Sequence, residues 1–132
     1  MAASILMILC DTNILIEFYK NNEQVINELR QIGADNLAVS VISVAELYFG
    51  AFDKAELGKL KKHLAAMHQL PLNTAVSNTF LQLMETYSLS HKPSIPDALI
   101  AATAIEHDIP LYTLNLKDFR FIEMLQLHNT AS

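Results

Sequence analysis

Residues 5–10 read ILMILC, and the sequence turns polar at residues 11–13, which read DTN. An apolar run without alternation is typical of a strand that is buried on both faces of a sheet. Such strands belong to parallel sheets that carry helices on both sides. The run ends in Cys10, the single cysteine of the chain, which we interpret as a buried strand residue. Asp11 therefore follows directly after a buried strand.

Outward from this strand, helical patterns alternate with short strands. Strands are predicted at residues 37–39, 70–72 and 110–113, the middle one at a sheet edge because it contains Pro71. Helical patterns are predicted at residues 13–19, 24–32, 40–52, 54–67, 74–87 and 97–107, with a short closing helix at 116–121. This alternation predicts an α/β fold with a mainly parallel sheet and helices on both faces.

Composition narrows the class of protein. A chain of 132 residues predicts one domain, and 52% hydrophobic residues with three Gly and four Pro exclude a disordered chain. A single cysteine excludes a disulfide framework and a cysteine-based zinc site. No apolar stretch reaches the roughly 20 residues of a membrane span, and no basic segment precedes the first apolar run as in a signal peptide. We therefore expect a soluble, cytoplasmic protein without a membrane partner.

The charge balance limits how an anionic partner could bind. The net charge is −5, the wrong sign for holding nucleic acid by bulk electrostatics. An anionic partner must therefore meet a local basic patch, bound cations, or both. The visible basic cluster is Lys54, Lys59, Lys61 and Lys62, which is interpreted either as a solvated helix face or as a set of phosphate contacts.

Four acids flank the predicted junctions between strands and helices. They are Asp11, Glu46, Asp97 and Asp118. In a parallel α/β sheet, binding sites lie at the carboxyl ends of the strands. Clustered carboxylates repel one another unless a cation neutralises them, and Mg²⁺ or Mn²⁺ prefers oxygen ligands. Together the four acids indicate a metal-dependent site for phosphodiester chemistry.

Each acid also has a structural explanation. Residues 43–46 and 115–118 have the spacing of helix capping boxes. Asp97 in a first helical turn would be favoured by the helix dipole, and Asp11 could cap the helix that follows it. The spacing leaves both interpretations open.

Four blocks of this sequence resemble a known family. They read LCDTN at 9–13, SVISVAEL at 40–47, PDALIAATA at 96–104 and YTLNLKDF at 112–119. In this order and at these separations they are similar to the PIN domain, most closely the VapC-type toxin ribonucleases of prokaryotic toxin–antitoxin pairs. The resemblance covers essentially the whole chain.

The resemblance implies one PIN domain over residues 1–132, folded as a three-layer α/β/α sandwich, and a Mg²⁺- or Mn²⁺-dependent endoribonuclease. Asp11, Glu46 and Asp97 match the three family acids, and Asp118 falls at the fourth, so these four are the expected catalytic and metal-binding residues. Supporting polar positions are matched by Asn13, Ser43, Thr113 and Asn115. Leu114 departs from the family, because relatives often carry arginine there.

The resemblance also implies partners. Relatives cut structured RNA such as tRNA, form homodimers, and are blocked by a small antitoxin whose tail enters the active-site groove. The basic cluster would then contribute RNA contacts. Aromatic residues of the early helices are expected to offer an apolar groove to an antitoxin helix, namely Phe18, Tyr19, Tyr48, Phe49 and Phe52.

Two other classes of protein fit part of the pattern. A phosphotransfer or phosphatase-like domain also gathers acids at strand ends, but it would need a second Asp in place of Asn13 or an acidic pair near Asp11. A PIN-like fold could also serve only as a protein-binding module, although such a module has no need to retain repulsive carboxylates. A nuclease assay separates these alternatives.

Overall fold

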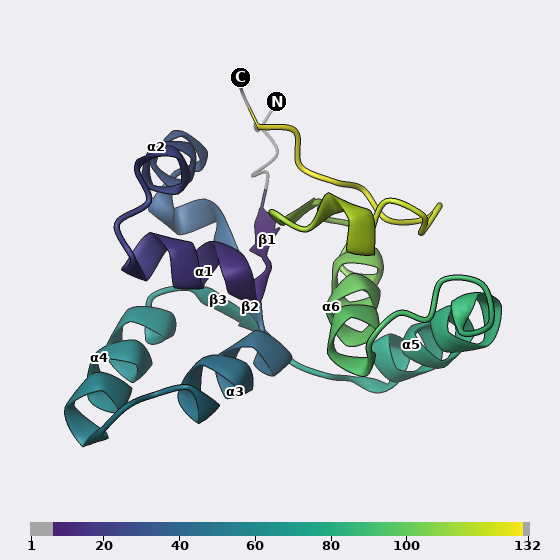
Figure 1. Ribbon diagram of the computed structural model, residues 1–132, viewed down its shortest axis with the longest axis horizontal. Coiled ribbons are helices and arrows are strands. Elements are labelled where there is room, and N and C mark those ends of the chain that lie inside the picture. Colours follow the sequence, from purple (N-terminus) through teal and green to yellow (C-terminus); the bar gives the residue numbers. More distant parts are fainter. Residues whose placement is uncertain (1–6, 131–132) are drawn as a thin grey trace, which may run out of the picture.

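The centre of the protein is a four-stranded sheet in which every strand pairs in parallel with its neighbours. The computed structural model describes residues 7–130 (Figure 1). The strands stand in the order β3-β2-β1-β4, which places β3 at an edge as expected. Their bounds are β1 Ile8–Cys10, β2 Leu37–Ser40, β3 His68–Leu70 and β4 Leu111–Tyr112.

Helices cover both faces of the sheet (Figure 1). Four helices pack on one face and two on the other. On the first face lie α1 Thr12–Tyr19, α2 Glu23–Ile32, α3 Val41–Phe49 and α4 Lys54–Ala65. On the second lie α5 Thr74–Tyr87 and α6 Ile95–Glu106. Two short 3₁₀ turns, η1 Ala34–Asn36 and η2 Leu116–Asp118, complete the elements. The three-layer α/β/α architecture is confirmed.

The apolar run at the start of the chain supplies both cores of the sandwich. Ile8 and Cys10 belong to the core beneath α1–α4, whereas Leu9 belongs to the core beneath α5 and α6. Successive strand side chains point to opposite faces, so a strand with helices on both sides needs apolar residues at every position. Burial raises the pKa of the Cys10 thiol to about 12, as suits a buried strand residue rather than a reactive one.

Several predicted boundaries were wrong in informative ways. β3 lies at His68–Leu70 rather than 70–72, because it pairs with β2 before Pro71. The helical pattern at 40–52 is α3 with Ser40 as its N-cap, and it ends at Gly50. The predicted closing helix is only the single turn η2. The part of the first strand predicted at residues 5–6 lies outside the described residues.

The chain after η2 covers the outer edge of β4, which the sequence analysis left unassigned. The Leu111 N–H donates to Gln126 O at 2.9 Å, and the His128 N–H donates to Leu111 O at 2.8 Å. His128 Nε2 also lies 2.6 Å from Glu28 Oε2 of α2. An uncovered edge would offer unpaired backbone groups to other chains, so this segment protects the sheet. Within residues 7–130, no helix is long and apolar enough to cross a membrane.

Candidate active site

The carboxyl ends of β1 and β4 bring the first polar residues together. The Asp11 N–H donates to Tyr112 O at 2.9 Å and extends the ladder one residue past β1. This bond sets Asp11 beside Thr113, the first residue after β4. Both side chains are buried, with 4% of Asp11 and 6% of Thr113 exposed. The site therefore begins as an extension of the sheet, not as a loop.

The Asp11 carboxylate is held by two hydrogen bonds. Thr12 N–H donates to its Oδ1 at 2.8 Å, and the Thr113 hydroxyl donates to its Oδ2 at 2.8 Å. Burial raises the pKa of Asp11 from its ordinary 3.8 to about 6. The two hydrogen bonds lower this pKa, whereas the nearby Asp97 and Glu46 carboxylates raise it further. The charges of Asp97 and Glu46, two of the three acids expected beside Asp11, thus act on its carboxylate.

Thr12 links the end of β1 to α3. Its hydroxyl oxygen lies 2.7 Å from Glu46 Oε1 and 2.7 Å from Ser43 Oγ, so its single proton can serve only one of the two at a time. Ser43 is fully buried, one turn before the exposed Glu46. Thr12 was absent from the predicted site residues, although it lies inside the quoted block DTN, and its contact with Glu46 is the signal that tertiary structure adds.

Asp97 enters the site from the start of α6. Ser94 is the N-cap, and its hydroxyl accepts from the Asp97 N–H at 3.1 Å. The buried alanines of this helix let it lie close against the sheet and α5. Burial raises the pKa of Asp97, the Ser94 contact lowers it, and the Asp118 and Glu46 carboxylates raise it. The four acids are therefore electrostatically coupled through Asp11 and Asp97.

The polar residues after β4 complete the edge. Asp118 lies in η2 and is exposed. The Thr113 hydroxyl accepts from the Asn115 N–H at 3.0 Å while it donates to Asp11, so it fixes both the loop and the carboxylate. Asn115 is exposed, and its side chain makes no capping hydrogen bond.

The capping explanations now separate. Ser43 lies inside α3, whose N-cap is Ser40, so the predicted capping box at 43–46 is wrong. The capping box at 115–118 is also wrong, because Asn115 makes no capping hydrogen bond. Asp11 is the N-cap of α1, and Asp97 lies in the first turn of α6. Capping accounts for the backbone at Asp11 and Asp97 but leaves Glu46 and Asp118 without a structural role.

The donor atoms of the site suit a hard divalent cation. Asn13 Oδ1 is buried and has no hydrogen-bond partner among residues 7–130, and an unpartnered buried oxygen calls for a ligand or a water. In the same residues, no group of three or more His, Cys, Asp or Glu side chains is arranged so that it could hold a metal ion. Mg²⁺ usually keeps several of its waters and binds through few carboxylates. A Mg²⁺ ion at this edge would therefore be held by fewer than three of these side chains, with water completing its coordination shell.

Two further groups of predicted residues, the basic cluster and the aromatic residues of the early helices, lie outside the hydrogen-bonded network around Asp11. Lys54, Lys59, Lys61 and Lys62 are all exposed on α4. Of the aromatic set, Phe18 and Tyr48 pack against the core, which corrects the expectation that they would be exposed. Tyr19 is 37% exposed, and its hydroxyl lies 2.7 Å from His63 Nδ1. Phe49 and Phe52 are 94% and 89% exposed.

Comparisons with known proteins agree with this architecture. The sequence model of the PIN domain family matches residues 8–123. Over 122 residues, 91% of each chain, the sequence is 34% identical to Ribonuclease VapC10 of Mycobacterium tuberculosis. The chain therefore belongs to the PIN domain family.

Solved structures extend the likeness to three dimensions. A toxin–antitoxin complex from Klebsiella pneumoniae contains a chain that is 27% identical, with a TM-score of 0.76, over 89% of this chain and 93% of that one. FitAcB from Neisseria gonorrhoeae gives 27% identity and a TM-score of 0.78 over 94% and 98%. VapBC-1 from nontypeable Haemophilus influenzae contains a chain that is 25% identical, with a TM-score of 0.82, over 96% of this chain and 100% of that one.

Proposed function

We propose that this protein is a metal-dependent endoribonuclease that acts as the toxin of a toxin–antitoxin pair. Its similarity to Ribonuclease VapC10 over 91% of both chains supports this activity. The observation that carries the proposal is the coupling of four carboxylates at the carboxyl edge of the sheet, with Asp11 buried and its pKa raised to about 6. A phosphotransfer domain would also gather acids, but it would need a second Asp in place of Asn13 or an acidic pair near Asp11.

In this proposal Mg²⁺ or Mn²⁺ would lie among Asp11, Glu46, Asp97 and Asp118, which would hold it in part through bound waters. When bound, the ion lowers the pKa of a water and stabilises charge on phosphate oxygens. The chain itself supplies the positioning: Thr113 and the Thr12 N–H fix the Asp11 carboxylate, and the Thr12 hydroxyl holds Glu46. The Ser43 hydroxyl lies within hydrogen-bond distance of the Thr12 hydroxyl, and the Asn115 N–H donates to the Thr113 hydroxyl. These contacts preorganise oxygen donors that would otherwise repel one another.

RNA cleavage tests the proposal directly. Purified protein is incubated with total RNA, including tRNA, in Mg²⁺ or Mn²⁺, with and without a chelator, beside Asp11→Asn. We expect cleavage by the parent that the chelator and Asp11→Asn both abolish. Cleavage that survives the chelator would contradict the metal, and cleavage that survives Asp11→Asn would contradict the site. A protein without nuclease activity that still binds its partner would support the binding-module alternative.

The partner we propose is a small antitoxin, which also fits the toxin–antitoxin complexes among the structural relatives. Phe49 at the end of α3 and Phe52 before α4 expose nearly all of their side chains. Two such rings, three positions apart in the sequence, offer exposed apolar area of the kind that receives the apolar face of a helix. Co-purification of the protein encoded by the adjacent reading frame tests this assignment.

We also propose a homodimer working in the cytoplasm, where its RNA substrate is found. Leu81 and Leu89 are 62% and 91% exposed on and just after α5, on the opposite side of the sheet from Phe49. Apolar surface in this place suits contact with a second copy of the chain. Light scattering on the purified protein measures its mass, and a monomer at every concentration would contradict the dimer.

A further inference from the structure

A cavity adjoins the edge of the sheet that carries Asp11, Glu46, Asp97 and Asp118, which we call the acid edge. A cavity of about 660 Å³ lies between the loop that joins α5 to α6 and the segment after η2. This volume falls within the roughly 300–1,000 Å³ of ordinary ligand sites. We name it the rim cavity, and its lining is residues 90–94, Asp97, Lys117, Asp118, Arg120 and Phe121. Because two of the four acids line it, the rim cavity opens directly from the candidate active site.

Three cations line the rim cavity. Lys92 comes from the α5–α6 loop, while Lys117 and Arg120 come from η2 and the turn after it. All three are exposed, and the only Lys or Arg of residues 7–130 within 4.0 Å of a carboxylate is Lys20. In a chain of net charge −5, one third of the nine Lys and Arg thus surround one hollow without ion-pair partners. They outnumber the two carboxylates of the lining, Asp97 and Asp118, and this excess of positive charge favours an anionic ligand.

Lys92 adopts a backbone conformation that favours glycine. Its φ is +48°, in the left-handed region. The turn is held because the N–H groups of His91 and Lys92 both donate to Tyr87 O, at 2.8 and 3.0 Å. A lysine in this place gives the cavity a cation where glycine would be less strained, which supports a role for its side chain.

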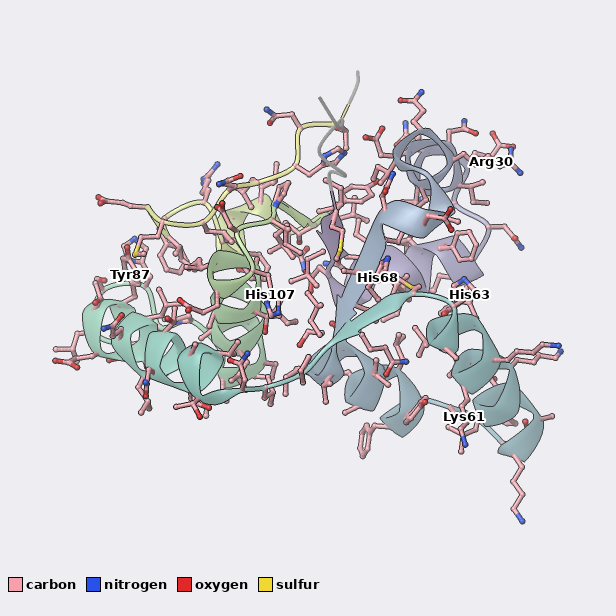
Figure 2. The ribbon with its side chains drawn as sticks, turned by 180° about the vertical axis from the view of Figure 1, so that it is seen from behind. Arg30, Lys61, His63, His68, Tyr87 and His107 are labelled. Atoms are coloured by element: carbon pink, nitrogen blue, oxygen red, sulfur yellow. The ribbon has the colours of Figure 1, made fainter. Side chains whose placement is uncertain are left out.

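The side chains of His91 and Phe121 form another part of the wall of the rim cavity. The rings of His91 and Phe121 are stacked, with centroids 4.2 Å apart and planes 7° from parallel. Tyr87 packs edge-on against both, at 5.8 and 5.0 Å, and Ser90 Oγ lies 2.8 Å from His91 Nδ1. Figure 2 shows Tyr87 at the end of α5, far from Lys61 on α4. The His91 ring is exposed and held in place, so it offers a fixed face to a planar ligand.

We propose that the rim cavity binds the nucleotide next to the scissile phosphate of a single-stranded RNA segment. Lys92, Lys117 and Arg120 bind its phosphate, and an unpaired base stacks on His91. Phosphate-binding cations beside an aromatic ring match a nucleotide, whereas an acidic peptide would use the charge but not the ring. This inference rests on the proposed function, because it takes RNA as the ligand of the acid edge.

The charge half of the proposal is tested by RNA binding in EDTA, which keeps the strand uncut. The ligand is a fluorescein-labelled single-stranded RNA of about 12 nucleotides, read by anisotropy over a range of salt concentrations. We expect the double variant Lys117→Ala/Arg120→Ala to bind about tenfold more weakly or worse, with a log–log salt slope smaller by about 1.4, since each contact contributes about 0.7. Arg30→Ala, an exposed cation on α2, is the matched control (Figure 2). An unchanged slope in the double variant overturns the proposal.

The stacking half is tested by His91→Ala against two RNA ligands. We expect about fivefold weaker binding of the single strand, and no change for the same strand with abasic sites, because stacking contributes on the order of 1–3 kcal/mol per base. Equal losses on both strands overturn the stacking. A poly-glutamate peptide of similar length that displaces RNA as well as unlabelled RNA does overturns the choice of nucleotide over acidic protein. Unchanged melting temperatures of all variants show that these exposed positions leave the fold intact.

Cleavage in Mn²⁺ separates this inference from the proposed function. If the parent cuts RNA and Lys117→Ala/Arg120→Ala binds and cuts it equally well, the function stands and the rim cavity proposal fails. If the parent cuts no RNA but its binding depends on Lys117, Arg120 and His91, the rim cavity is an RNA-binding site, while the nuclease assignment and the placing of this nucleotide beside a scissile phosphate both fail.

Discussion

The α4 lysines and the rim cavity carry the same kind of charge but arise from the sequence in opposite ways. Lys54, Lys59, Lys61 and Lys62 are neighbours in one helix, whereas Lys92 meets Lys117 and Arg120 only because two loops face each other. The α4 cluster is visible in the sequence, yet no residue of α4 lines the cavity beside Asp97 and Asp118. The fold therefore brings together the cations that lie beside the candidate active site, while cations along one helix can remain a solvated face.

The largest expected effect comes from breaking the acid edge itself. Asp97→Asn removes one like charge and one oxygen donor, so RNA cleavage should fall by about 100-fold or more. Metal sites already lose about 10- to 100-fold in activity when a residue that only hydrogen-bonds a metal ligand is replaced. Without metal the variant should melt at the parent's temperature or above it, because the Asp97 pKa is raised by burial and by neighbouring acids. Melting curves with and without Mn²⁺ measure both effects. A variant that melts well below the parent and keeps the full metal-induced rise would make Asp97 a capping residue only.

The next effect concerns the side of the molecule that carries α4. Replacing Phe49 and Phe52 by Ser should weaken antitoxin binding on the order of 30-fold, since buried aromatic anchors contribute about 2 kcal/mol or more at interfaces. Both rings are almost fully exposed, so the melting temperature and RNA cleavage should not change. Titration calorimetry with the purified partner measures the affinity. The control is Met124→Ser after η2, 68% exposed, and an equal loss in that variant would move the interface away from α3.

A smaller effect follows from the pH dependence of Asp11. Its pKa is raised from 3.8 to about 6, so the folded state keeps a proton that the unfolded chain has released. This contribution to stability is full below pH 3.8 and is lost as pH rises through about 6. The unfolding free energy of the metal-free protein should therefore fall by roughly 1 kcal/mol between pH 5 and 7.5.

Urea denaturation in EDTA measures that pH dependence. Asp11→Asn should remove this part of the pH slope, while Lys59→Ala on α4 should retain it. Groups that do not interact with Asp11 are present in all three proteins and cancel in the comparison. Equal slopes in the parent and in Asp11→Asn would mean that Asp11 is not strained by its surroundings.

The smallest effect is expected for the α4 lysines. We expect the fourfold Ala variant at residues 54, 59, 61 and 62 to weaken RNA binding by a few-fold and to lower the salt slope by less than the rim cavity double variant does. The four side chains are exposed on α4, and none of them lines the rim cavity beside Asp97 and Asp118. Anisotropy on the same labelled RNA gives the comparison. An unchanged slope would assign these lysines to a solvated helix face. A larger loss than in the rim cavity variant would make α4, and not the rim cavity, the main RNA-binding region.

Much of the architecture could be predicted because it depends on local pattern. The unbroken apolar run before Asp11 indicates a strand between two helical layers, and α5 spans Thr74–Tyr87 as its periodicity predicts. Edges of elements were less predictable: β3 ends before Pro71, and η2 is shorter than the pattern at 116–121 suggests. Strand ends depend on pairing with a neighbour, which a single sequence does not display.

The sequence by itself determined the α/β class, the burial of the first strand and the presence of four acids near the ends of predicted elements, because hydrophobic periodicity and the alternation of strands and helices are visible along the chain. Tertiary structure alone decided that the Thr12 hydroxyl meets Glu46, that Ser43 supports rather than caps, and that Arg120 lies with Lys92 around one cavity. These contacts join residues that are 31 or more positions apart in the case of Thr12. Their partners are chosen by how the sheet and helices pack, which no local pattern encodes.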